Sequence, residues 1–199
     1  KKNTLISLYT ILFLICIQGF IGWYMVKSGL TQGTDVSHYR LSIHLILAFI
    51  IFIFLLWNIL KYKYENTFVA YLKLPKYIPI LFLIIILIQI FFGALVSGLD
   101  AAQIYQSWPL MNSSYFPDDS DIKALFSLNS FETPSIVQFH HRNLAYLIFI
   151  FYLFILFMIL RNSGYMYLRN ISLLIFISLF VQIFLGIFTI LSGAQIILA

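Results

Sequence analysis

The sequence contains few of the residues on which soluble proteins and most metal sites depend. Charged residues make up 10% of its 199 residues, and it has a single cysteine, Cys16. One thiol excludes an intrachain disulfide, and zinc and iron–sulfur sites lack their usual ligand motifs. No acidic residue interrupts the long hydrophobic stretches, which excludes di-iron carboxylate chemistry and an ion-pump pathway at membrane depth. We expect Cys16 to be a small buried residue of the first stretch.

Hydrophobic residues, by contrast, make up 62% of the chain. Five apolar stretches reach the roughly 20 residues that a membrane-spanning helix needs. Each is continuous and does not alternate with polar residues, which is typical of such helices. The sequence therefore predicts an all-α integral membrane protein with five transmembrane helices, near residues 5–26, 41–60, 77–96, 136–160 and 169–191.

The net charge of +5 reflects membrane topology and does not indicate nucleic-acid binding. Most basic residues fall on one predicted side of the membrane, where Glu65 is the one acidic residue. Most acidic residues fall on the other side. The positive-inside rule then places the first residue of this chain in the cytoplasm and its last residue outside. The basic residues of the cytoplasmic side are Lys1, Lys2, Lys61, Lys63, Lys73, Lys76, Arg161 and Arg169.

The first, third and fifth stretches end in one pattern: a glutamine, a glycine four residues later, and a closing Ser-Gly. The copies begin at Gln18, Gln89 and Gln182. Glutamine and glycine one turn apart suit close helix packing with an interhelical hydrogen bond. The copies are either packing seams or parts of a duplicated unit. Because histidine-bearing stretches follow the first two copies, a third should follow the last, and we expect the chain to be a fragment.

Two histidines, His44 and His141, lie near the same predicted end of the second and fourth stretches, each followed four residues later by alanine. A buried imidazole needs a partner, because an unpaired polar group in apolar surroundings costs several kcal/mol. The small alanine leaves room beside the ring for a flat cofactor. The pattern indicates axial ligands of haem iron, and the alternative is a structural hydrogen bond between helices.

Several polar residues accompany these histidines. Arg40 and Arg142 are placed to pair with haem propionates, or else to extend toward the membrane surface. His140 points about 100° away from His141 around the helix. The remaining candidates to surround the haem site are Gln138, Glu132 and Trp108.

The connection over residues 97–135 is longer than a turn requires and lies on the same predicted side as both histidines. It contains Pro109, Pro117 and an acidic run at 118–121. Long ordered loops are usually lids or binding loops. A lid, a binding loop and a solvated linker are the alternatives.

Four segments resemble the haem A synthase family, most closely its alphaproteobacterial and mitochondrial branch. They read G-W-Y-M-V-K-S-G-L at 22–30, V-S-H-Y-R-L-S-I-H-L at 36–45, G-A-L-V-S-G-L-D-A with Y-Q-S-W-P-L-M across 93–111, and N-S-F-E-T-P-S-I-V-Q-F-H-H-R at 129–142. The resemblance covers nearly the whole chain.

This resemblance implies two pseudo-symmetric four-helix bundles, of which the chain contains helices three to seven. Residues 1–60 would end the N-terminal bundle, 61–76 form a cytoplasmic loop, and 77–199 belong to the C-terminal bundle. His44 would bind substrate haem O, and His141 would ligate a cofactor haem b through its iron. The family's essential glutamate lies in a helix outside this chain, so the resemblance identifies no catalytic residue here.

The reaction implied by the resemblance is oxidation of a methyl group of haem O to the formyl group of haem A, which cytochrome c oxidase uses. Haem O synthase and cytochrome oxidase assembly factors are the expected partners, in a bacterial inner membrane or a mitochondrial inner membrane. The electron acceptor and a homo-oligomeric state stay open. The alternatives are a b-type membrane electron carrier and a non-enzymatic membrane assembly protein.

Overall fold

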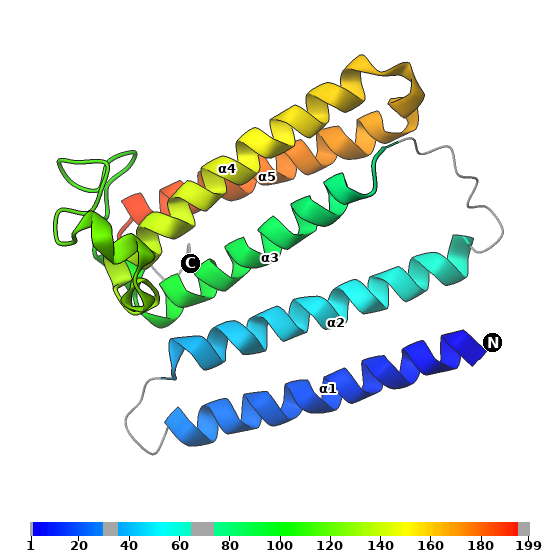
Figure 1. The fold of residues 1–199 in the computed structure, drawn as a ribbon, viewed down its shortest axis with the longest axis horizontal. Helices are drawn as coiled ribbons and strands as arrows, with labels where there is room; N and C mark the ends of the chain where they lie inside the picture. Colours follow the sequence, from blue (N-terminus) through cyan, green and yellow to red (C-terminus); the bar gives the residue numbers. More distant parts are fainter. Residues whose placement is uncertain (1, 30–35, 65–73, 195–199) are drawn as a thin grey trace. The chain divides into compact units, whose positions relative to one another are not determined.

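A computed structural model describes residues 2–29, 36–64 and 74–194, and the long hydrophobic stretches form helices in it (Figure 1). The α-helices of this part are α1 (Lys2–Gly29), α2 (His38–Tyr64), α3 (Tyr77–Gly98), α4 (Pro134–Arg161) and α5 (Arg169–Leu191). All five are long and apolar enough to cross a membrane. The prediction of an all-α membrane protein with five spanning helices is confirmed.

The helices α1 and α2 extend beyond the hydrophobic boundaries predicted for them. Helix α1 continues to Gly29, and α2 begins at His38. A hydrophobic boundary marks where lipid contact ends, whereas a helix continues for as long as its backbone hydrogen bonds do. The polar residues at these ends therefore belong to the helices that they flank.

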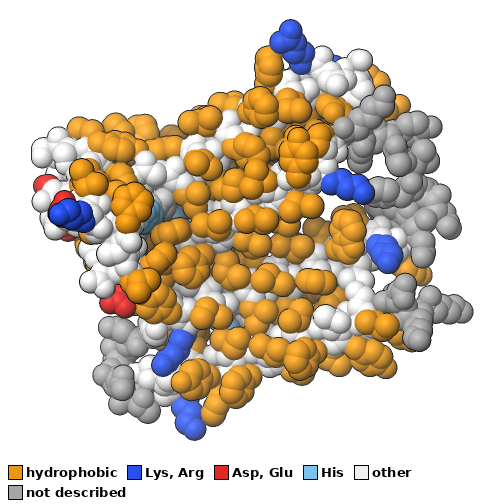
Figure 2. Space-filling view, in the orientation of Figure 1, with side chains coloured by type: hydrophobic (Ala, Val, Ile, Leu, Met, Phe, Trp, Pro, Cys, Tyr) orange, Lys and Arg blue, Asp and Glu red, His pale blue; other side chains and the backbone are white. Residues whose placement is uncertain are grey.

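Large hydrophobic side chains are exposed along every one of the five helices. Phe13 is 65% exposed, Ile150 67% and Phe184 60%. Figure 2 shows how hydrophobic side chains cover most of the visible helical surface. A water-soluble protein does not expose so much contiguous apolar surface, so lipid tails are the natural neighbours of these side chains. Cys16 is also exposed, and our prediction that it is buried is wrong, because α2 covers a different face of α1.

The chain divides into two compact units, and Lys1–Ala70 is the first. Helices α1 and α2 form an antiparallel hairpin in it (Figure 1). Toward one end, the Ser7 hydroxyl donates to Asn58 Oδ1 at 2.7 Å. Toward the other, Arg40 of α2 donates to the Ser28 hydroxyl of α1 in a short hydrogen bond. The hairpin is thus stabilised by polar contacts between otherwise apolar helices.

The second unit, Tyr71–Ala199, places α4 in contact with both α3 and α5. Pro134 begins α4, at a position where its missing N–H costs no helical hydrogen bond. The Tyr152 hydroxyl on α4 donates to the Ser172 carbonyl on α5 at 2.9 Å. The buried core of this unit consists of Ile78, Tyr152, Ile155, Leu156, Ile159 and Tyr165.

The connection between α3 and α4 folds back onto α4. It contains the short 3-10 helices η1 (Ala101–Gln103), η2 (Ile122–Phe126) and η3 (Leu128–Phe131). A further one, η4 (Ser163–Leu168), joins α4 to α5. Tyr105, Met111 and Pro117 of the connection are buried. Their burial fixes the loop against the helices.

Tyr105 is the polar centre of this loop. Its ring is 2% exposed, and its hydroxyl donates to the Asp118 carboxylate in a short hydrogen bond. Burial, followed by this hydrogen bond, raises the pKa of Tyr105 to about 12. The loop therefore buries a tyrosine that stays protonated and connects two of its distant segments.

Candidate functional site

His141 lies on the side of α4 that packs against α3, and Gln89 and Gly93 of α3 surround its ring. The Gln89 amide nitrogen Nε2 lies 3.2 Å from both ring nitrogens of His141 and donates to its carbonyl oxygen at 3.2 Å. A methyl group added at Gly93 would lie 3.2 Å from Cε1 of the ring. The imidazole is therefore held directly against the α3 backbone.

His44 has the same surroundings in the first unit. Gln18 Nε2 of α1 lies 3.2 Å from Nε2 of His44 and donates to the His44 carbonyl oxygen at 3.0 Å. A methyl group added at Gly22 would lie 2.9 Å from Cε1 of the ring. Each of the first two glutamine–glycine pairs thus receives the histidine of the next helix. In both units, the glutamine–glycine repeat forms the surface against which the histidine ring packs.

The third copy, on α5, has no such neighbour in the part of the chain that the structure describes. Gln182 is exposed, and no atom lies within 4 Å of a methyl group added at Gly186. A glutamine–glycine pair alone therefore does not create the arrangement. A histidine on a packed neighbouring helix completes it.

Lone imidazoles of this kind suit haem iron better than a bare metal ion. Within the described residues, no three histidine, cysteine or acidic side chains gather closely enough to hold a metal ion. Porphyrin supplies four ligands itself, so a single imidazole from the protein is enough on each side. Buried Nδ1 of His44 has no hydrogen-bond partner among the described residues. A ring nitrogen without a partner is an atom that an external ligand would satisfy.

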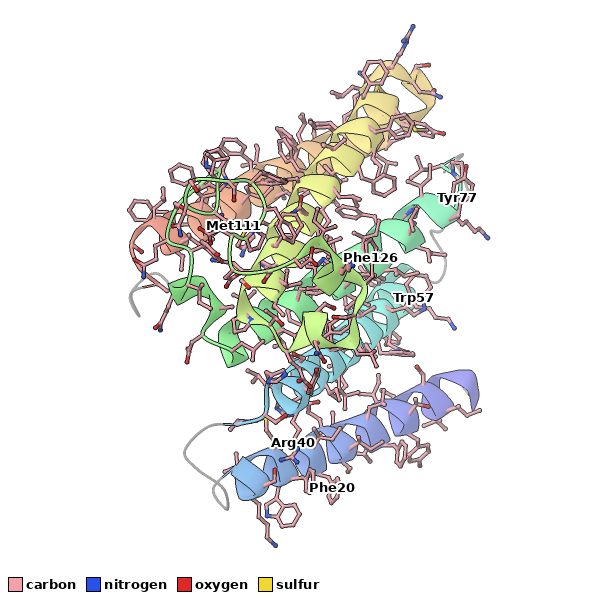
Figure 3. All side chains as sticks on the ribbon, turned by 60° about the vertical axis from the view of Figure 1, so that its left-hand side comes forward. Phe20, Arg40, Trp57, Tyr77, Met111 and Phe126 are labelled. Atoms are coloured by element: carbon pink, nitrogen blue, oxygen red, sulfur yellow. The ribbon has the colours of Figure 1, made fainter. Side chains whose placement is uncertain are left out.

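Arg40 lies near the end of α1 that carries Ser28, as Figure 3 shows. One of its terminal nitrogens donates to the Ser28 hydroxyl in a short hydrogen bond. Its guanidinium also lies over the Tyr24 ring, 4.9 Å from the ring centre. Arg40 and His44 are one turn apart on α2, so the structure places a positive charge one turn from this imidazole.

Arg142 is 6% exposed and is surrounded by loop backbone. Its terminal nitrogens donate to the carbonyl oxygens of Tyr105 and Ser107, both at 2.9 Å, and more weakly to that of Leu110 at 3.5 Å. Gln138, one turn earlier on α4, donates to the same Tyr105 carbonyl at 3.0 Å. These two α4 side chains therefore anchor the 97–135 loop beside His141.

The other predicted neighbours of the histidines do not gather at one point. His140 packs against the Phe92 ring of α3, with ring centres 5.4 Å apart. Trp108 is 43% exposed and donates from its indole nitrogen to the Tyr146 hydroxyl at 2.8 Å. Glu132 is exposed at the end of η3. The residues that lie directly beside the His141 ring are Gln89 and Gly93 of α3, which were not predicted to lie there.

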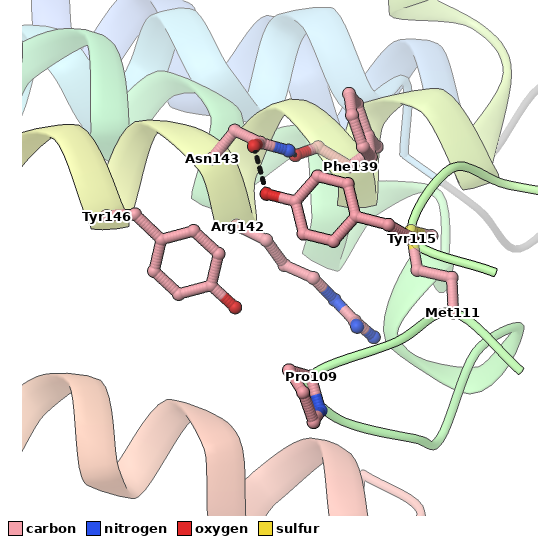
Figure 4. Close-up of a pocket in the computed structure, with 7 residues that line it drawn as sticks. All are labelled: Pro109, Met111, Tyr115, Phe139, Arg142, Asn143 and Tyr146. Carbon is pink, nitrogen blue, oxygen red and sulfur yellow. Dashed lines mark hydrogen bonds between the residues drawn. The ribbon is translucent and has the colours of Figure 1, made fainter.

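A pocket of about 160 Å³ lies on the loop side of α4 (Figure 4). The Tyr115 hydroxyl in it donates to Asn143 Oδ1 at 2.5 Å. This volume includes open solvent, the pocket encloses no room even for a water molecule, and His141 does not line it. It is therefore not a porphyrin site. Its lining residues are Pro109, Met111, Tyr115, Phe139, Arg142, Asn143 and Tyr146.

Sequence reasoning missed this loop-side cluster around Tyr105, Tyr115 and Tyr146. The prolines and aromatic residues of the loop gave a signal for ordered structure. The partners of these side chains, however, include backbone carbonyls and residues about 30 positions away, such as Asn143 for Tyr115. Contacts of that kind leave no spacing pattern in a single sequence.

Comparison with known proteins shows similarity over the whole chain. It is 44% identical over 192 residues to the heme A synthase of Pelagibacter ubique (strain HTCC1062), covering 94% of this chain and 54% of that protein. It is 37% identical over 203 residues to the heme A synthase of Rickettsia rickettsii (strain Sheila Smith), covering 100% of this chain and 59% of the relative. It is 38% identical over 203 residues to the heme A synthase of Rickettsia bellii (strain OSU 85-389), covering 100% of this chain and 60% of that relative.

The chain thus spans between 54% and 60% of the length of these relatives. No solved structure matches it significantly. The family described as cytochrome oxidase assembly protein, COX15-CtaA, matches residues 1–199. Because this match covers the whole chain, the chain belongs to the COX15-CtaA family.

Proposed function

We propose that this chain forms the central part of a haem A synthase, which oxidises a methyl group of haem O to a formyl group. Two observations support the proposal: its relatives are named heme A synthase, and each unit holds one imidazole in a glutamine–glycine site. The second observation carries the chemistry, because imidazole is a standard axial ligand of haem iron.

The two histidines divide the work between two haems. His141 ligates the iron of a cofactor haem b, and His44 ligates the iron of substrate haem O. Bound haem iron supplies the oxidising chemistry, and the protein binds and orients the porphyrin and excludes water. The presence of one glutamine–histidine arrangement in each unit supports the use of two haems.

The arginines supply positive charge near these imidazoles. Arg40 approaches from α2, and its guanidinium interacts with a hydroxyl and an aromatic ring. It therefore keeps its charge available for a propionate. Arg142 is committed to loop carbonyls, so its main role is to hold the loop. No carboxylate pairs with Arg142 in the described part of the chain, and its charge would still attract a propionate nearby.

We further propose the membrane arrangement and the partners. Residues 1–60 end an N-terminal bundle, 61–76 form a cytoplasmic loop, and 77–199 belong to a C-terminal bundle, with the 97–135 loop outside a bacterial inner membrane or the equivalent mitochondrial membrane. Lys61, Lys63 and Arg161, at the ends of α2 and α4, support this orientation. Haem O synthase and cytochrome oxidase assembly factors are the proposed partners.

Replacement of each histidine tests the proposal. In protein purified from membranes, His141→Ala should abolish retention of the tightly bound haem, seen as loss of the Soret band. His44→Ala should keep that haem and stop conversion of haem O, measured by extracting the pigments. If His141→Ala retains a normal six-coordinate spectrum, the ligand assignment is wrong. Recovery of only unmodified haem from cells that depend on the wild-type gene would instead indicate a b-type electron carrier.

A further inference from the structure

The glutamine–glycine pairs of α1 and α3 contact their histidines in the same way, which indicates that both pairs have the same role. We propose that Gln18 with Gly22, and Gln89 with Gly93, position the imidazoles of His44 and His141 for haem ligation. This inference rests on the proposed function. It assigns to the glutamines the part of positioning residues, which act on haem through the histidine and do not touch the reacting atoms.

The glycines provide the space that the rings occupy. Two carbon atoms in good contact are about 3.5–4.0 Å apart, whereas a methyl group at Gly22 or Gly93 would lie 2.9 or 3.2 Å from ring atom Cε1. A larger residue would therefore push the ring away from its helix. Gly19, three residues before Gly22 on α1, has no atom within 4 Å of such a methyl group. Glycine is therefore required only at the position that faces the ring.

The glutamine amide sets the orientation of the ring. Its nitrogen has two N–H donors, and it contacts both the carbonyl oxygen and the ring of the same histidine in each unit. A carbonyl oxygen only accepts hydrogen bonds, so it determines which end of the amide is turned to the histidine. One glutamine side chain thereby holds both the backbone and the ring of its histidine.

The other end of each amide is unused in the described structure. Gln18 Oε1 and Gln89 Oε1 are both buried without a hydrogen-bond partner among the described residues. A metal-ligating histidine donates its second ring N–H to an acceptor, which makes the ligating nitrogen more basic. A 180° rotation of the amide would turn Oε1 toward the N–H of a ligating ring, in place of the donor that faces the free ring and its carbonyl oxygen.

The test compares two substitutions of Gln89 in the purified, haem-loaded protein. Gln89→Leu keeps the volume and removes the amide, so the haem should stay bound while its midpoint potential rises, because a less basic ligand stabilises ferric iron less. Gln89→Glu keeps a stronger acceptor and should lower the potential. Gln103→Leu, at an exposed loop position, is the matched control and should leave the potential unchanged.

The glycines are tested separately by haem affinity. Gly93→Ala should weaken binding of added haem b by about 10–100-fold, the range seen when groups supporting a metal ligand are removed, and should convert part of the low-spin spectrum to high-spin. Gly22→Ala should weaken binding of haem O in the same range. Gly19→Ala should leave both affinities unchanged.

The results separate this inference from the proposed function. If the wild type binds haem through His141 and both Gln89 variants have its potential, the positioning role is wrong and the haem function stands. If Gln89→Leu does not accumulate, Gln89→Glu decides alone: a lower potential supports the role, and an equal or higher one overturns it. A wild type with no Soret band overturns both.

Discussion

Arg142 donates to the Tyr105 carbonyl at 2.9 Å and thereby joins the loop between α3 and α4 to the helix that carries His141. The same carbonyl accepts from Gln138 at 3.0 Å. The loop is thus fixed to α4 by side chains three and one positions away from His141, so movement of the loop and of this helix end are coupled.

Arg142→Lys should release the loop although it keeps the positive charge. An ammonium group is a point donor and cannot reproduce the planar arrangement that reaches both Tyr105 and Ser107. We expect the free energy that holds the loop on α4 to fall by about 1.5–3 kcal/mol, which is typical of a hydrogen bond to a charged group. Limited proteolysis in detergent should cut within residues 97–135 faster than in the wild type.

The matched control is Arg161→Lys. Arg161 lies at the opposite end of α4, exposed, with its guanidinium 5.7 Å from the Phe157 ring centre. Its replacement should not change the cleavage rate of the loop. Equal cleavage of Arg142→Lys and the wild type would show that Arg142 does not hold the loop.

The loop should lose stability at high pH because of Tyr105. Its pKa is about 12 in the folded protein and about 10 in an unfolded chain. A raised folded pKa gives stability that is complete below pH 10 and is lost as the pH rises through about 12. Faster loop proteolysis should appear only above about pH 10.

Tyr105→Phe identifies the group responsible. Phenylalanine cannot ionise, so this variant should lack the pH-dependent increase in cleavage that the wild type shows. It also loses the hydrogen bond to Asp118, so its loop should be cleaved faster at neutral pH. A variant with the same rise in cleavage above pH 10 as the wild type would rule out Tyr105 as its cause.

The contact between α4 and α5 includes one buried hydrogen bond, from Tyr152 to the Ser172 carbonyl at 2.9 Å. Tyr152→Phe should lower the free energy of unfolding by about 0.6 kcal/mol, and by at most about 1.7 kcal/mol, as for other hydrogen bonds between membrane helices. Thermal unfolding in detergent measures the effect. Tyr167→Phe, at a side chain that is 85% exposed, is the control and should leave the midpoint unchanged. A loss well above this range would mean that the ring packing also changed.

The helices could be predicted because their signal is local. A continuous hydrophobic stretch in 77–98 needs no knowledge of its neighbours to be recognised as α3. The glutamine–glycine repeat was also visible, but the sequence did not show that Gln89 contacts the ring of His141, 52 residues away. Pairing of that kind depends on the rotation of two packed helices, which a single sequence leaves open.

The arginines illustrate the limit at the site. The sequence predicts that Arg142 pairs with a propionate or extends toward the membrane surface. In the described residues its guanidinium donates to the backbone carbonyls of Tyr105, Ser107 and Leu110, and its pairing with a propionate stays a prediction. Every residue has such a carbonyl, so nothing in the side chains of the loop marks these three as acceptors. Arg40 lies close to Ser28 and Tyr24. It is half-buried, whereas Arg142 is buried, so a propionate can reach Arg40 more easily.

The orientation in the membrane can be tested with thiol labels, because the chain has only one cysteine to remove. In a Cys16→Ser background, Asp119→Cys should react with a membrane-impermeant reagent added to intact cells, since Asp119 is exposed in the outer loop. Lys63→Cys, exposed near the end of α2, should react only after the membrane is opened. The physical reason is the basic charge at that end of the helix, which favours the cytoplasmic side. Labelling in the reverse order would invert the topology and place both histidines near the cytoplasm.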